Sequence, residues 1–140
     1  MELERINEIE AQLLTHPQVE CPVQHTFSPG VYLRTIRMPA GTFVIGHKHR
    51  TKHLNIVLSG CALVIVDGEI RRMQAPLVFE SNPGVRKLLY ILEDCDWATV
   101  HATDETDIAK LEEQLIEKSA AFTQHELEQA QRALESHQTT

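Results

Sequence analysis

The sequence lacks the features of a disulfide framework, a membrane span or a secretory leader. Its three cysteines form no CxxC pair, and an odd number leaves at least one thiol unpaired, so we expect free thiols and a reducing, cytoplasmic setting. No apolar run approaches the roughly 18 residues that a transmembrane helix needs. Residues 1–5 combine acidic and apolar side chains without a basic segment, which predicts no secretory leader.

Positive charge is also scarce. The chain carries 13 Lys and Arg against 20 Asp and Glu, a net charge of −7, which argues against a general nucleic-acid-binding protein. We therefore expect no nucleic-acid partner and no membrane partner. The sequence does contain enough apolar residues for a core, 42% of 140 residues, and its length fits one domain with appended helices.

Short runs of β-branched and apolar residues fill the middle of the chain, separated by turn-forming residues. Val31–Met38 is the clearest predicted strand, and Asp67-Gly68 is the strongest hairpin turn. We also expect turns at Ser59-Gly60 and at residues 93–96. About eight strands at this spacing, without helices between them, predict an antiparallel barrel or sandwich over residues 19–102.

Both ends of the chain show helical periodicity instead. We expect a short N-terminal helix within residues 1–18 and two C-terminal helices within residues 103–136. Thr103 or Asp104 is the predicted cap of the first C-terminal helix, and the capping box from Thr123 to Glu126 is the predicted start of the second. Residues 137–140 are expected to form a frayed tail. The apolar helix faces must pack on the barrel or across a homodimer interface.

The densest chemistry lies in the run from His47 to His53, which holds three of the eight histidines. If this run is one strand, alternate side chains share a face, so His47, His49 and His53 project together. Three imidazoles on one face are suited to a transition metal. The alternatives are a polar strand face, or histidines that hydrogen-bond one another or a ligand without metal.

Two glycines frame this run at fixed spacing: Gly41-x5-His47-x-His49-x3-His53-x6-Gly60. The pattern resembles the first motif of the cupin superfamily, in which glutamate stands at the position of His53. The resemblance implies an all-β cupin barrel, the double-stranded β-helix or jelly roll, over about residues 25–102. It also implies that His47, His49 and His53 are metal ligands. Without the carboxylate, Zn²⁺, Fe²⁺, Ni²⁺, Cu²⁺ and Co²⁺ all remain possible.

A second, degraded cupin motif follows at Pro83–Lys87, where Lys87 stands in place of the family's fourth ligand, a histidine. If a turn centres on Asp94, Lys87 lies opposite His101, and directly opposed residues share a face. We therefore predict that His101 is the fourth ligand, or a general acid/base beside a three-histidine metal. The alternative is an ordinary histidine at a strand end.

Other cationic side chains fall near the motif residues. Candidates for binding an anion lie on or beside predicted strands: Arg34, Arg37, Arg86 and Lys87. His25 is expected at the surface, with the pocket mouth as the alternative. The chain is also similar to small, single-domain cupins encoded by bacteriophages and prophages. The segments that carry this closer resemblance are Pro29–Tyr32, the motif around His47, and Trp97–His101.

Three functions remain open from the sequence. The first is a metal-dependent enzyme acting on a small molecule, with His101 as ligand or proton carrier. The second is a non-catalytic protein that binds or sequesters a small molecule, such as an anionic metabolite or a nucleotide signal. The third is a structural or assembly protein with a vestigial pocket. The resembled family contains isomerases, hydrolases, lyases and dioxygenases, so the resemblance selects no activity.

Overall fold

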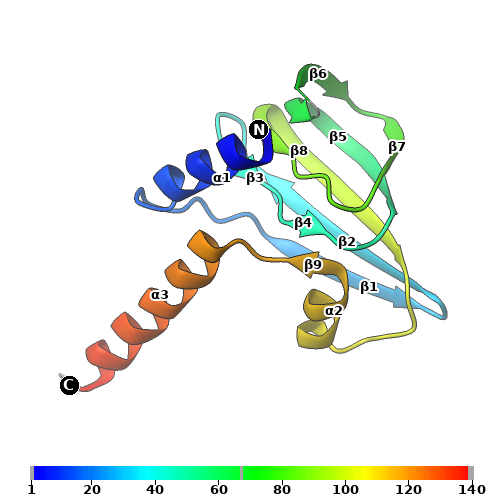
Figure 1. Ribbon diagram of the computed structural model, residues 1–140. Coiled ribbons are helices and arrows are strands. Elements are labelled where there is room, and N and C mark those ends of the chain that lie inside the picture. Colours follow the sequence, from blue (N-terminus) through cyan, green and yellow to red (C-terminus); the bar gives the residue numbers. More distant parts are fainter. Residues whose placement is uncertain (1, 67, 139–140) are drawn as a thin grey trace.

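Two long antiparallel strands organise the computed structural model, which describes residues 2–66 and 68–138. Strand β5 (His53–Val66) pairs with β8 (Leu88–Ala102) along almost its whole length (Figure 1). Both strands continue through the segments where turns were expected, so the predicted turns at Ser59-Gly60 and at residues 93–96 are wrong. Register shifts between residues 57 and 62 bend β5 at this place instead.

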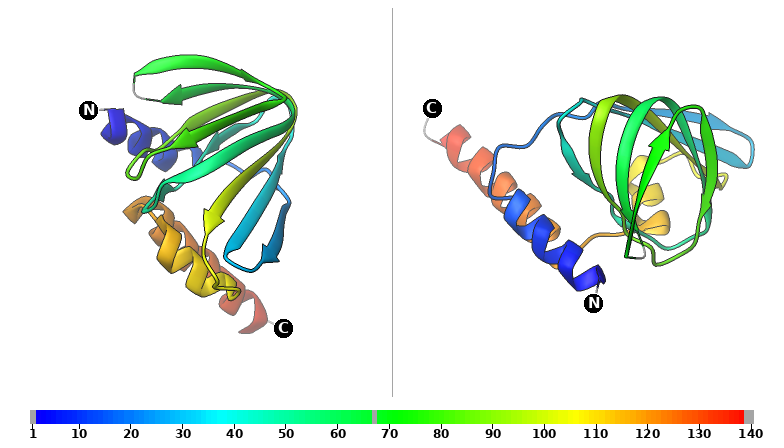
Figure 2. Two further views of the ribbon diagram at one scale, coloured as in Figure 1. Left: turned by 90° about the vertical axis from the view of Figure 1, so that its right-hand side faces the viewer. Right: turned by 90° about the horizontal axis from the view of Figure 1, so that it is seen from above.

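Shorter strands pair with the two halves of the long ones. They are β1 (Val23–Ser28), β2 (Val31–Met38), β3 (Phe43–Ile45), β6 (Glu69–Gln74) and β7 (Leu77–Ser81). The first half of β5 lies between β7 and the second half of β8, which continues to β2 and β1. The second half of β5 lies between β6 and the first half of β8, which continues to β3. The bent long strands therefore connect two layers into an open barrel (Figure 2).

Alternation along these strands places the core inside the barrel. Val57, Ala62, Val64, Ile91 and Cys95 are fully buried there. Because successive strand residues point to opposite faces, their neighbours in sequence face outward, and Leu58 is about half exposed. The hairpin expected at Asp67-Gly68 connects β5 to β6, which pair as far as Val66↔Glu69; Asp67 itself lies outside the described residues.

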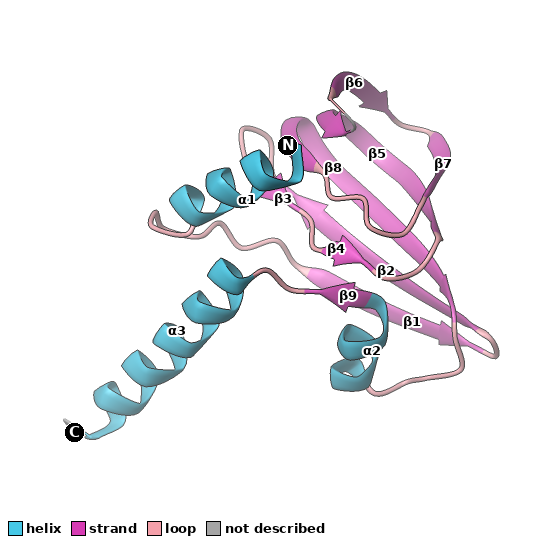
Figure 3. Cartoon of the chain, viewed as in Figure 1, coloured by secondary structure: helices cyan, strands magenta, loops and turns pink. Residues whose placement is uncertain are grey.

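The helices lie outside the sheet, as the sequence predicts, but with different bounds. Helix α1 spans Glu2–Leu13, α2 spans Ile108–Leu115 and α3 spans Ala120–Gln138 (Figure 3). A two-stranded ribbon of β4 (Lys48–His49) and β9 (Ile116–Glu117) joins the C-terminal segment to the barrel. No helix among the described residues is both long and apolar enough to cross a membrane.

The predicted helix caps are wrong because neighbouring residues take these roles. Asp107 caps α2 and accepts a hydrogen bond from the Lys110 amide at 3.2 Å. The Ser119 hydroxyl accepts from the Phe122 amide at 3.1 Å, which sets the start of α3. Residues 137 and 138 belong to α3 rather than to a frayed tail, and residues 139–140 lie outside the described part of the chain.

Candidate functional site

The histidine run does not form one strand. His47 lies between β3 and β4, His49 ends β4, residues 50–52 bend, and His53 begins β5. The expectation of one shared strand face is therefore wrong, because the chain turns between the second and third histidines. The sequence carries no signal for this bend, because Arg50-Thr51-Lys52 contains neither glycine nor proline, the residues that usually mark one.

The structure nevertheless brings three histidines together. The His49 and His53 rings lie 4.1 Å apart, His53 and His101 lie 5.0 Å apart, and His49 and His101 lie 5.7 Å apart, between ring centroids. His53 and His101 are almost completely buried, each with less than a twentieth of its surface exposed. We call these three residues the histidine cluster.

His101 enters the cluster by a different route from the one predicted. Because β8 is continuous, Lys87 does not lie opposite His101, and the predicted hairpin register is wrong. His101 pairs with Tyr32 on β2, and the adjacent Val100 pairs with Leu54 on β5. Lys87 instead donates a hydrogen bond to the Ser81 hydroxyl at 2.6 Å.

Hydrogen bonds fix the roles of the ring nitrogens. His53 Nδ1 lies 3.2 Å from the Thr51 carbonyl oxygen, which can only accept, so Nδ1 carries the proton and Nε2 holds a lone pair. His101 Nε2 lies 3.0 Å from the Thr99 hydroxyl. The opposite nitrogens, His53 Nε2 and His101 Nδ1, are buried without a hydrogen-bond partner among the described residues. Unpartnered buried nitrogens of this kind are costly unless a ligand occupies them.

Burial keeps these rings neutral. It lowers the pKa of His49 to about 3, with further lowering by His53 and His101. Burial likewise lowers the pKa of His101 to about 4, with His53 and Arg34 adding to the effect. The pKa of His53 is also lowered by burial, against a smaller opposing effect of its hydrogen bond to Thr51. Neutral imidazoles are the form that binds metal.

A divalent metal fits the histidine cluster in composition but not yet in geometry. Three imidazoles around one tetrahedral ion, at about 2 Å from nitrogen to metal, place their ring centroids about 5 Å apart, which is close to the separations found. Within residues 2–66 and 68–138, however, no three His, Cys, Asp or Glu side chains converge as a preformed metal site. Rotation of the rings would be needed to aim their free nitrogens at one point.

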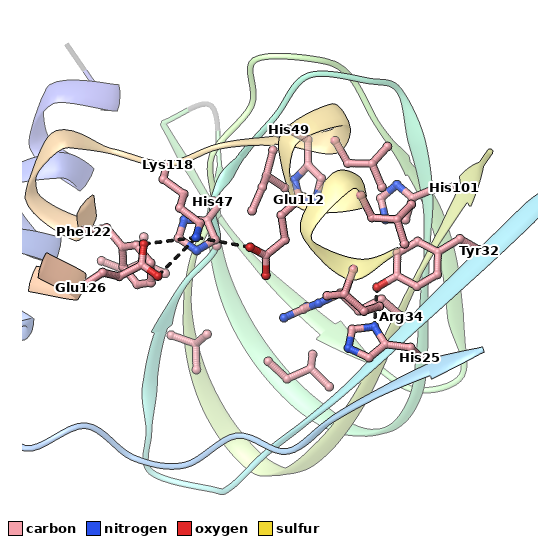
Figure 4. A pocket seen from close by; sticks show the side chains of 18 residues that line it. His25, Tyr32, Arg34, His47, His49, His101, Glu112, Lys118, Phe122 and Glu126 are labelled. Carbon is pink, nitrogen blue, oxygen red and sulfur yellow. Dashed lines mark hydrogen bonds and ion pairs between the residues drawn. The ribbon is translucent and has the colours of Figure 1, made fainter. Parts of the chain in front are cut away.

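A cavity of about 370 Å³ opens beside the histidine cluster, with His49 and His101 in its wall (Figure 4). The C-terminal segment covers it: Leu111 and Leu115 of α2 pack on Tyr32, and Ile116 of β9 joins them. Lys118 lies at its rim, where it pairs with Glu112 at 3.3 Å and Glu126 at 3.1 Å. Residues that follow the last barrel strand thereby cover part of the opening of the barrel.

His47 lines the same cavity but stands apart from the histidine cluster in its ring contact. Its ring packs edge-on against Phe122 of α3 at 4.5 Å between centroids. Its Nδ1 is buried without a partner among the described residues, and burial lowers its pKa. His47 is therefore placed to contact a ligand in the cavity.

Two more polar groups line or support this site, and sequence reasoning missed the second. His25, for which the pocket mouth was the alternative to the surface, lines the cavity and lies 2.6 Å from the Tyr32 hydroxyl through its Nδ1. Asn55 is buried two residues after His53, where it donates to the Ser81 hydroxyl and accepts from the Trp97 indole. The alternation of β5 was the available signal for Asn55, since it places Asn55 on the same face as His53.

Comparison with solved structures identifies the architecture. KdgF from Halomonas sp. is 18% identical, with a TM-score of 0.53 over 65% of this chain and 86% of that chain. A cupin superfamily protein from Desulfitobacterium hafniense is 14% identical, with a TM-score of 0.52 over 67% of this chain and 87% of that one. The fold is a cupin fold.

An RmlC-like cupin family protein with a double-stranded β-helix fold, from Methanocaldococcus jannaschii, is similar at the same level. It is 15% identical, with a TM-score of 0.51 over 64% of this chain and 85% of that one. No family model matches the sequence. No curated protein sequence matches it either. At these identities the comparisons establish the cupin fold of the barrel and leave its chemistry to be argued from its own residues.

Proposed function

We propose that this protein is a metal-binding cupin that acts on a small molecule, with His49, His53 and His101 as the metal ligands. The clustering of three neutral imidazoles, two of them buried, beside a cavity carries the proposal. The two unpartnered nitrogens, His53 Nε2 and His101 Nδ1, are the atoms that a cation would satisfy. A Zn²⁺-like ion at this place would polarise a substrate oxygen or lower the pKa of a bound water.

The protein's own side chains have definite parts in this proposal. The Thr51 carbonyl and the Thr99 hydroxyl orient the His53 and His101 rings, as second-layer partners of metal-binding histidines do. His47 lines the cavity, and its Nδ1 has no hydrogen-bond partner among the described residues, so we assign to it the role of general acid or base that His101 had as an alternative. The C-terminal segment over the cavity would limit the access of bulk water.

A non-catalytic binding protein is the second candidate. Lys87 favours it, because its ammonium group lowers the pKa values of His49 and His53 through charge repulsion and would oppose a metal cation in the same way. In this candidate the same cavity holds a small molecule without turnover.

Metal analysis of the purified protein separates the two candidates. We expect about one equivalent of Zn, Fe, Ni, Cu or Co by elemental analysis, and its loss in His49→Ala, His53→Ala and His101→Ala. Removing one ligand should weaken Zn²⁺ binding roughly 100-fold or more in a competition titration. His47→Ala and the exposed-site variant His16→Ala should retain the metal. Protein that is metal-free and does not bind added Zn²⁺ or Co²⁺ would exclude the proposal in favour of the binding candidate.

A further inference from the structure

One arginine points into the cavity beside the histidine cluster. Arg34 lies on β2 between Tyr32 and Ile36, and alternation along the strand turns all three side chains to the inner face. Figure 4 shows its guanidinium group in the cavity between His25 and Glu112. Arg34 is half-buried, so its charge is partly removed from water.

The guanidinium group of Arg34 makes no hydrogen bond and no ion pair with any residue that the structure describes, although its backbone pairs within the sheet. The contrast is Arg86, the other arginine that is not exposed, which donates to Gly46 O at 2.8 Å, to Asn7 and to the carboxylate of Glu10. A partly desolvated guanidinium with five donors and no acceptor is unfavourable unless a ligand supplies one.

The other charges of the cavity do not satisfy Arg34. Glu112 and Glu126, its two carboxylates, both pair with Lys118 at the rim. The two carboxylates balance the two cations of the cavity in number, but both carboxylates lie against Lys118 and neither forms an ion pair with Arg34. Burial is the main cause of the lowered pKa values of His49 and His101, and the charge of Arg34 adds to the lowering of both.

The remaining wall of the cavity is mostly apolar. Its apolar residues come from β2, β3, α2, β9 and α3: Ile36, Val44, Leu111, Leu115, Ile116 and Phe122. Such a wall favours a ligand with an apolar body. One planar guanidinium matches one carboxylate, which accepts two parallel N–H bonds, whereas a doubly charged phosphate would need further cations.

We propose that the cavity binds a small carboxylic acid with an apolar body, whose carboxylate pairs with Arg34. The acid would extend from Arg34 toward the histidine cluster, so it is also the class of substrate for the metal-dependent function proposed above, on which this assignment of a substrate rests. Binding of the acid itself depends on Arg34 and not on a metal.

Calorimetric titration of the metal-free, EDTA-treated protein tests the proposal. The probes are three acids of increasing size, each against its neutral amide: acetate, 4-methylpentanoate and phenylacetate. We expect at least one of the two larger acids to bind, and to bind roughly 10- to 100-fold more tightly than its amide. Arg34→Gln should abolish this preference, and Arg34→Lys should keep part of it. Arg72→Gln, the same charge change at an exposed arginine, should leave it unchanged.

Several results would overturn this assignment. The unmutated protein would bind none of the three acids, or would bind each acid no more tightly than its amide. An Arg34→Gln variant that is folded by circular dichroism would keep the preference for the acid, or phenyl phosphate would bind more tightly than phenylacetate. Metal and acid titrations of the unmutated protein separate the two proposals. If this protein binds no metal but still binds the acid through Arg34, the enzyme proposal falls alone; if it binds metal normally and binds none of the acids, the substrate class falls alone.

Discussion

At the scale of single residues, one buried ion pair ties the helices to the barrel. The side chains of Arg86 and Glu10 are 2% and 6% exposed and form an ion pair. Glu10 also accepts a hydrogen bond from the Ser119 hydroxyl, just before α3. The two carboxylate oxygens of Glu10 thus connect α1, the start of α3 and the loop before β8.

Removing the charge of Glu10 tests this connection. We expect Glu10→Gln to lower the free energy of unfolding by about 3 kcal/mol, because a buried guanidinium is left without its counter-charge. Glu8→Gln on the exposed face of the same helix should change it by less than about 0.5 kcal/mol. Urea unfolding measures both, and equal effects of the two variants would contradict the role of the pair.

At the scale of elements, the bend of the two long strands depends on one glycine. Gly60 has φ +82°, and a Cβ atom there would lie 2.1 Å from the Asp94 carbonyl oxygen of β8. No side chain fits between backbones this close. The glycine that ends the cupin-like motif therefore permits β5 and β8 to cross from one layer to the other in contact.

Gly60→Ala should for this reason destabilise the barrel by about 3 kcal/mol or more, from positive φ and steric overlap together. Gly41→Ala is the matched control, because Gly41 has φ +83° and nothing lies within 4 Å of the added Cβ. This variant should lower the free energy of unfolding by only about 1–2 kcal/mol. Thermal or urea unfolding gives the comparison. A Gly60→Ala variant no less stable than Gly41→Ala would show that the strands separate easily at the bend.

At the scale of the whole molecule, buried neutral histidines make stability depend on pH. The pKa values of His101 and His49 fall to about 4 and about 3 on folding. Between those values and the unfolded pKa near 6.5, the unfolded chain binds more protons, so the free energy of unfolding falls as the pH falls. Above pH 6.5 both states are neutral and the effect vanishes.

Each of these histidines should lower the free energy of unfolding by up to about 1.4 kcal/mol per pH unit as the pH falls from 6.5 toward 4. Urea unfolding of metal-free protein at pH 7, 6 and 5 measures the slope. The double variant His49→Gln/His101→Gln should flatten it, whereas His16→Gln should not. An unchanged slope in the double variant would mean that other groups cause the acid sensitivity.

The exposed face of α3 is relevant to whether the protein forms a homodimer. Leu127 and Leu134 of α3 are 58% and 64% exposed, so the apolar stripe of this helix is not covered within the described chain. The homodimer expected from the sequence stays a prediction, as does the resemblance to phage-encoded cupins.

The sequence by itself determined the class of fold. Alternation of apolar residues and the turn residues between them predicted an antiparallel barrel with helices at both ends, because these patterns depend only on neighbours along the chain. The spacing from Gly41 to Gly60 also predicted a metal site at the histidines, which stays a proposal, but it did not predict that Gly60 serves a bend instead of a turn.

Only the tertiary structure decided how the site is assembled. Whether Ser59-Gly60 forms a turn or a bulge depends on Asp94 of the partner strand, and the place of His101 depends on that same pairing. The turning of His47 toward Phe122 and the lack of a partner for Arg34 depend on a C-terminal segment far away in sequence. Local periodicity sets which face a side chain takes within one strand, but contacts between strands and helices decide which faces meet.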